Sequence, residues 1–257
     1  MLELPEPSRK RLRRSPLDLV VCQVRHDRDL SVADGKKAVR LGKALGDAYP
    51  VPEELHGQEL RIQGGPGGVH ARHEEVQGGW RFQSPDRKWT VTVTPEAYSL
   101  ETTEYLDWDD FSGRLRVLTE AVGDLFDLDV EKRLGLRYID KLSRSDVSEI
   151  GDWQHWVHPA LLGPVLHPAL GAAVDAHQGI SRFLVDADAT VMLRHAHVRE
   201  DDQWMLVMDH DCFRESVVEF TTDGIMKGVE HLHTVALQVF QALISPEMFE
   251  YLDGEAE

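Results

Sequence analysis

Arg133-Leu-Gly-Leu-Arg-Tyr-Ile-Asp-Lys-Leu142 is the stretch of this 257-residue chain that most directly indicates its fold. It lies near the midpoint and has the pattern of a β-strand. Residues two apart in a strand share a face, so Arg133 and Arg137 lie on one face and Tyr138 on the other. Gly135 lies between the two arginines and permits a close approach. We therefore expect a strand that buries Tyr138 and begins a second half of the chain.

The segments before and after this strand predict the same order of elements. In the first half they are a strand at 19–25, a helix at 34–49, a hairpin at 80–94, a strand at 98–103 and a helix from Asp109 or Asp110. In the second half they are a strand at 134–142, a helix-rich stretch at 159–174 that Pro164 and Pro168 break, strands at 181–185, 190–194 and 204–209, and a helix at 224–243. The first strand and the last helix begin 90 positions apart in each half.

This order predicts an α+β fold of two similar β-α-β-β-β-α halves, with antiparallel sheet packed against long helices. We expect a basic tail at 1–15, a first half at 16–130 and a second half at 131–257, the halves packed as one unit.

The composition is that of an ordinary globular protein, with 42% hydrophobic and 28% charged residues. No apolar run is long enough for a membrane span, and the first residues lack the apolar core of a secretory signal. We therefore expect a cytoplasmic protein that binds no membrane. Cys22 and Cys212 are far apart in the sequence and are expected to be free, buried thiols.

The formal net charge of −17 argues against non-specific binding to nucleic acid, which depends on clustered lysine and arginine. Residues 1–14 are the exception, because Arg9, Lys10, Arg11, Arg13 and Arg14 outnumber the acidic residues there. The segment is either a solvated tail, which we favour, or an arm that binds nucleic acid or another partner.

Several short motifs run through nearly the whole chain. They are Pro16-Leu17, Trp80-x-Phe-x-Ser84 with Asp86, Tyr105-x-x-Trp108-x-x-Phe111, Arg133-Leu-Gly-Leu-Arg-Tyr-Ile-Asp140, and Leu232-His233 followed by Phe240 and Ile244-Ser245. In this combination the chain resembles a sporadically distributed prokaryotic family of roughly 260 residues that has no assigned activity. The family more often has Glu at the position of Asp18, Asn at that of Asp140 and Thr at that of Ser245. The resemblance implies no catalytic residues; the family's patchy distribution implies an accessory or defence-associated role.

Arg133 and Arg137 form one candidate ligand site. Two guanidinium groups on one face of a strand can hold a carboxylate or a phosphate. In so acidic a chain they can equally pair with internal acids such as Glu101 or Glu104, and we favour internal pairing. His233 is a third candidate, because the spacing places it on the buried side of the last helix. There we expect a structural hydrogen bond to the sheet, with a ligand-facing role as the alternative.

His195 and His197 share a face of a predicted strand, and Asp209, or Asp211, could complete a zinc or iron site from the neighbouring strand. No established metal-binding spacing accompanies them, so we expect solvated histidines and no cofactor, with a divalent metal as the open alternative.

These observations favour a binding or interaction protein over an enzyme, and its expected partner is a protein or a small ligand. The alternatives are a metal-assisted enzyme that uses the His/Asp cluster, and a nucleic-acid binder that uses residues 1–14. A homo-oligomer remains open.

Overall fold

The computed structural model describes residues 4–55, 59–65, 68–74 and 78–254, with the backbone alone for 59–65 and 68–74. The strands are β1 (Leu17–His26), β2 (Val51–Glu54), β3 (Glu59–Gly65), β4 (Gly68–Glu74), β5 (Trp80–Gln83), β6 (Trp89–Thr94), β7 (Ala97–Thr102), β8 (Val130–Ser143), β9 (Gln178–Leu184), β10 (Thr190–Glu200), β11 (Gln203–Arg214) and β12 (Val218–Glu219). The α-helices are α1 (Gly35–Leu45), α2 (Trp108–Leu125), α3 (Thr222–Leu243) and α4 (Pro246–Asp253). Six 3₁₀ helices are η1 (Leu30–Ala33), η2 (Gly46–Ala48), η3 (Ile150–His155), η4 (Pro159–Leu161), η5 (Gly163–Leu166) and η6 (Gly171–Ala173).

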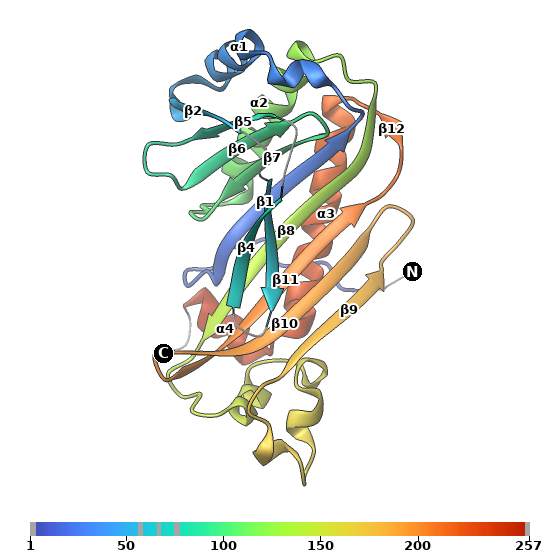
Figure 1. Ribbon diagram of the computed structural model, residues 1–257. Coiled ribbons are helices and arrows are strands. Elements are labelled where there is room, and N and C mark those ends of the chain that lie inside the picture. Colours follow the sequence, from blue (N-terminus) through green and yellow to red (C-terminus); the bar gives the residue numbers. More distant parts are fainter. Residues whose placement is uncertain (1–3, 56–58, 66–67, 75–77, 255–257) are drawn as a thin grey trace.

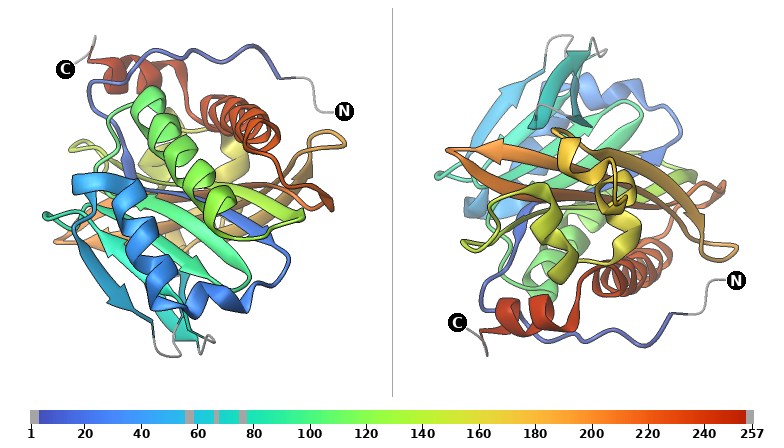
Figure 2. Two further views of the ribbon diagram at one scale, coloured as in Figure 1. Left: turned by 90° about the horizontal axis from the view of Figure 1, so that it is seen from above. Right: turned by 90° about the horizontal axis from the view of Figure 1, so that it is seen from below.

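One large antiparallel sheet organises the molecule. Its strands follow the order β2-β5-β6-β7-β1-β8-β11-β10-β9, and β12 pairs with β8. The long helices α2 and α3 lie on one side of this sheet, and the separate β3–β4 hairpin stands on the other (Figures 1 and 2). The predicted α+β class with antiparallel sheet and long helices is therefore confirmed. We call the side covered by α2 and α3 the helix face and the other side the open face.

The strand at 133–142 is the central strand β8, which pairs with β1 on one side and β11 on the other. Its alternation buries Leu134, Leu136 and Tyr138 against the helices, as the sequence indicated for Tyr138. The same alternation in β6 buries Trp89, Val91 and Val93. Sheet and helices thus enclose one apolar core.

Helix ends follow the capping chemistry expected from the sequence. The Asp107 side chain accepts a hydrogen bond from the backbone N–H of Asp110 and starts α2, and Thr221 starts α3 in the same way through Gly224. The Asp34 side chain caps α1 by accepting a hydrogen bond from the backbone N–H of Lys36. Because these caps and the apolar stripes agree, α2 and α3 are the long helices expected at the end of each half.

The connection between β8 and β9 differs from the expected helix. The stretch 159–174 forms only the short 3₁₀ helices η4, η5 and η6. Pro159, Pro164 and Pro168 interrupt it, and proline removes the amide that a continuous α-helix needs. Together with η3 this segment covers a second apolar cluster around Trp153 and Leu193.

No α-helix among the described residues combines the length and the apolar character of a membrane span.

Candidate functional site

The sheet separates the candidate residues into three places. Arg133 and Arg137 project from β8 onto the open face, and His233 approaches the sheet from α3 on the helix face. Asp209 is in register with Arg194, so it shares the open face, whereas His195 is in register with Met208 and points the other way. The predicted ligands therefore do not form one site.

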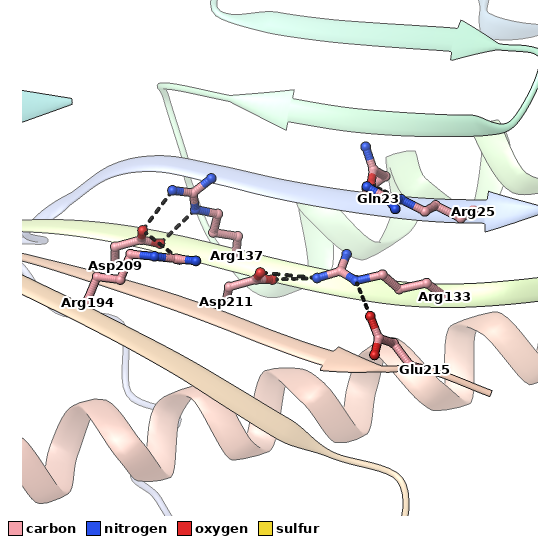
Figure 3. Close-up of polar contacts among 8 residues, drawn as sticks. All are labelled: Gln23, Arg25, Arg133, Arg137, Arg194, Asp209, Asp211 and Glu215. Atoms are coloured by element: carbon pink, nitrogen blue, oxygen red, sulfur yellow. Dashed lines mark hydrogen bonds and ion pairs between the residues drawn. The ribbon is translucent and has the colours of Figure 1, made fainter. Parts of the chain in front are cut away.

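Arg137 and Asp209 form the best-ordered ion pair on the open face (Figure 3). Nε and Nη2 of Arg137 each donate to one carboxylate oxygen, at 2.7 Å and 2.7 Å. Nη1 of Arg194 adds a third contact at 3.3 Å. Asp209 is only 3% exposed, so two guanidinium groups compensate a buried charge. Burial alone would lower the pKa of Arg137, but the contacts with Asp209 and Asp211 raise it.

A second ion pair, between Arg133 and Asp211, lies beside the first, nearer the N-terminal end of β8. Nη2 of Arg133 donates to both oxygens of Asp211, at 3.0 and 3.1 Å, and Nε lies 3.9 Å from Glu215 (Figure 3). A side chain at Gly135 would collide with the Arg133 guanidinium, which is the close approach expected from the sequence. Internal pairing, favoured from the sequence, is thus present, but the expected partners Glu101 and Glu104 are not involved.

The histidine–aspartate metal site is not assembled, and this corrects the alternative left open above. His195 and His197 are buried rather than solvated, and with His177 they pack beneath the 3₁₀ segment. Burial and the neighbouring His177 lower the pKa of both to about 4. Asp209 lies on the opposite face of the sheet, out of reach. Within the described ranges no group of three His, Cys, Asp or Glu side chains is arranged to hold a metal ion.

A small cavity of about 80 Å³ lies on the helix face between β8, β11 and α3. Its lining residues are Leu12, Ser15, Pro16, Leu17, Tyr105, Tyr138, Asp140, His210, His233, Ala236, Leu237 and Phe240. Most of these side chains are apolar or aromatic, and a few polar groups converge among them. That combination is typical of ligand sites.

Asp140 and His210 are the most deeply buried polar groups of this cavity, at 3% and 1% exposure. Nδ1 of His210 lies 3.4 Å from Oδ2 of Asp140, an ion-pair distance rather than a good hydrogen bond. Neither ring nitrogen of His210 has a hydrogen-bond partner among the described residues. Burial raises the pKa of Asp140, although His210 opposes part of that shift.

His233 joins the cavity to the sheet and to α2. Its Nδ1 is 2.8 Å from the Tyr138 hydroxyl, so the expected hydrogen bond to the sheet is confirmed. The ring stacks on Trp108 at 3.9 Å with 7° between planes, and Trp108 donates to Glu230. Burial lowers the pKa of His233 to about 4, so the imidazole is neutral at pH 7 and its Nδ1 can accept a hydrogen bond from the Tyr138 hydroxyl.

The basic N-terminal segment forms one wall of the cavity. Residues 4–15 run along α3 and α4 (Figure 2), and Leu12, Ser15 and Pro16 reach the cavity. Arg9 pairs with Glu230 at 2.7 Å. The segment therefore packs on the body of the protein, because the acidic residues of α3 and α4 complement it.

In the sequence, Asp140 belongs to the motif at 133–140, but no pattern placed it beside His210. A signal was present: Asp140 shares its strand face with the core residue Tyr138, and His210 shares its face with Cys212. Charged or polar side chains at core-facing strand positions are uncommon and indicate a partner or a function. The motifs quoted for the family resemblance also meet here, through Pro16, Tyr105 and His233 among others.

No protein-family model matches this chain, and no curated protein matches it either.

Proposed function

We propose that this chain is a binding protein that holds a small, uncharged or cationic molecule in the cavity between β8, β11 and α3. The observation that carries the proposal is His210, a side chain 1% exposed that faces the cavity. Its Nε2 has no hydrogen-bond partner in the described structure, and its Nδ1 has only the 3.4 Å contact with Asp140. A buried polar group without a partner costs about 1–3 kcal/mol. A ligand that hydrogen-bonds to it recovers that cost.

The charges of the cavity support this ligand class. Asp140 is its one acidic residue, and no lysine or arginine is among its lining residues in the described chain. His233 is neutral at pH 7 because burial lowers its pKa to about 4. An anion would find no compensating cation and would face Asp140, whereas a hydroxyl, amide or amine finds both donors and acceptors. The volume suits on the order of five non-hydrogen atoms.

The competing functions have less support. A metal-assisted enzyme lacks its ligand set, because Asp209 lies across the sheet from His195 and His197. A nucleic-acid arm would need its cations, yet Arg9 and Lys10 pair with acids of α3 and α4. We retain an accessory or defence-associated role as a proposal that rests on the family resemblance.

We also propose that the chain consists of two related halves, at 16–130 and 131–257. The order of strands supports it, because β5-β6-β7-β1 and β9-β10-β11-β8 approach the centre of the sheet from opposite edges. The final long helices α2 and α3 pack side by side on the same face. This organisation would place the cavity between the halves: most lining residues come from the second half, Pro16, Leu17 and Tyr105 come from the first, and Leu12 and Ser15 come from the segment before it.

The function is tested with a panel of small fragments that are neutral, cationic or anionic, observed by ligand-detected NMR. We expect neutral or cationic fragments to bind the wild type and anionic ones not to bind. Ala236→Leu, which fills the cavity and leaves its polar groups in place, should abolish that binding. Asp211→Asn, on the open face, is the matched control and should bind normally. Equal binding by wild type and Ala236→Leu, or no binding by any fragment, would refute the proposal.

A further inference from the structure

We propose that the surface of α3 and α4 that residues 4–15 cover, called the groove below, is a binding site for an extended basic peptide, and that residues 4–15 are its exchangeable occupant. The inference rests on the contacts of residues 4–15 and not on the small-molecule function of the cavity. The segment forms no helix or strand. It is held as proteins hold bound peptides, through its backbone and a few charged side chains.

Two glutamines on α3 contact the backbone of the segment. Gln241 Oε1 accepts a hydrogen bond from the Ser8 amide at 2.9 Å, and Gln241 Nε2 donates to the Ser8 carbonyl at 2.7 Å. Gln238 Nε2 donates to the Pro5 carbonyl at 3.1 Å. A side-chain amide that pairs with both the backbone N–H and the backbone C=O of one residue can bind an extended chain of any sequence. The glutamines therefore supply affinity without fixing the residue types.

Acidic side chains of the groove supply the preference for basic residues. Lys10 pairs with Asp253, whose side chain is only 5% exposed. Lys10 offsets part of the cost of burying this carboxylate, so the surface favours a cation at this position. Burial would raise the pKa of Glu230, but hydrogen bonds from Arg9 and Trp108 lower it overall. Asp253 and Glu230 can therefore pair with cations at adjacent positions of a peptide.

Two further contacts define the far end of the groove. The Arg14 guanidinium lies 4.5 Å above the Tyr251 ring and donates to the Tyr251 carbonyl at 2.9 Å. Leu12 packs against the second apolar cluster. The expected ligand is therefore an extended segment with neighbouring arginine and lysine, then an apolar residue and a further arginine, at the spacing of 9, 10, 12 and 14.

The contact at Arg9 is a weak one. Arg9 and Glu230 are 49% and 46% exposed, and an exposed ion pair contributes about 0–1 kcal/mol, so most of the charge-based affinity comes from the cation at the position of Lys10. The segment adds no strand to the sheet, so its release leaves the sheet and the α3 core contacts intact. A basic segment of a partner that presents the same chemistry can compete for the groove. Displacement would also remove Leu12 from the wall of the cavity.

The test uses the full chain carrying Arg9→Glu and Lys10→Glu, which weakens the internal occupant and leaves the groove unchanged. A fluorescent peptide of residues 4–15 with the wild-type sequence is titrated into it, and anisotropy is measured. We expect saturable binding to the variant and at least tenfold weaker binding to the wild-type chain, whose groove is filled. The same peptide carrying both glutamates should not bind.

Adding Gln241→Ala to the variant should weaken its binding of the peptide at least fivefold, because the contacts to the Ser8 backbone are lost. If the double variant does not fold, Lys10→Gln replaces it, since it removes one cation and introduces no negative charge. Equal binding of the peptide to variant and wild type, or no binding to either, would overturn the inference. Fragment binding in the cavity is measured separately, so failure of one proposal leaves the other standing.

Discussion

Each face of the sheet contains a buried aspartate, and the surroundings of the two aspartates differ. Asp209 on the open face and Asp140 on the helix face lie on neighbouring strands, and each is 3% exposed. Asp209 is held by the guanidinium groups of Arg137 and Arg194. Asp140 has one nearby ionisable partner in the described structure, the buried His210 at 3.4 Å. The first carboxylate is compensated by two cations, whereas the second faces a cavity.

The contrast teaches that burial by itself does not tell what an acidic residue does. On the open face the buried carboxylate of Asp209 is paired with two arginines, which reduces the attraction of this site for an external anion. On the helix face the polar groups have unused hydrogen-bonding capacity in an enclosed space. We therefore assign ligand binding to the helix face and structural support to the open face.

The largest expected effect comes from breaking the pair on the open face. Asp209→Asn removes the charge that compensates Arg137 and Arg194, so two partly buried guanidinium groups lose their counterion. We expect a loss of about 3 kcal/mol in the free energy of unfolding, measured with urea at pH 7. Fragment binding in the cavity should persist. A loss below about 1 kcal/mol would contradict the assignment of this pair as structural.

The second effect is acid destabilisation from the helix face. His195, His197 and His233 have pKa values lowered to about 4 by burial, against 6.5 in an exposed histidine. Between these values the unfolded chain binds more protons than the folded one, so stability falls as the pH drops from about 6.5 toward 4. We expect each of the three histidines to contribute a loss of about 2 kcal/mol between pH 7 and pH 5, measured by urea unfolding.

The matched control for that effect is the pair of substitutions His195→Gln and His197→Gln. Glutamine is neutral throughout this range, so the slope of stability against pH should be visibly shallower in this variant. An unchanged slope would mean that other groups cause the acid sensitivity.

The third effect is a gain. Burial raises the pKa of Asp140 above its usual 3.8, so ionisation above that raised pKa costs folding free energy. Asp140→Asn removes this cost, and we expect it to be neutral or to stabilise the protein by about 1 kcal/mol at pH 7. The gain should disappear below about pH 4, where Asp140 is protonated in both states. A destabilisation like that of Asp209→Asn would show that the two faces are equivalent.

The smallest effect concerns Arg133 and Asp211, whose side chains are 16% and 22% exposed. Asp211→Asn weakens an ion pair that water already screens, and Glu215 still faces the arginine at 3.9 Å. We expect a change of about 0.5 kcal/mol or less, smaller still in 1 M salt. A loss as large as that for Asp209→Asn would show that the contribution of these ion pairs to stability does not depend on their exposure to water.

Local patterns were sufficient for most of the fold. The alternation in 133–142 and in 89–94, and the capped apolar stripes of α2 and α3, identified the elements that form the sheet and cover it. The stretch 159–174 was the clearest departure, because its prolines leave only 3₁₀ turns where a helix was expected. The hydrogen bond of His233 to the sheet was also predictable from its place on the inward side of a helix.

The sequence by itself determined which residues share a face of each strand, because side chains alternate with a fixed period of two. Only the tertiary structure decided which faces of different strands coincide, since that depends on pairing and register. Register placed Asp209 beside Arg194 and away from His195, and it brought Asp140 next to His210. A shift of one residue would exchange the faces, so the register of the paired strands decides which side chains meet. The cavity and the peptide groove exist because segments hundreds of positions apart pack together.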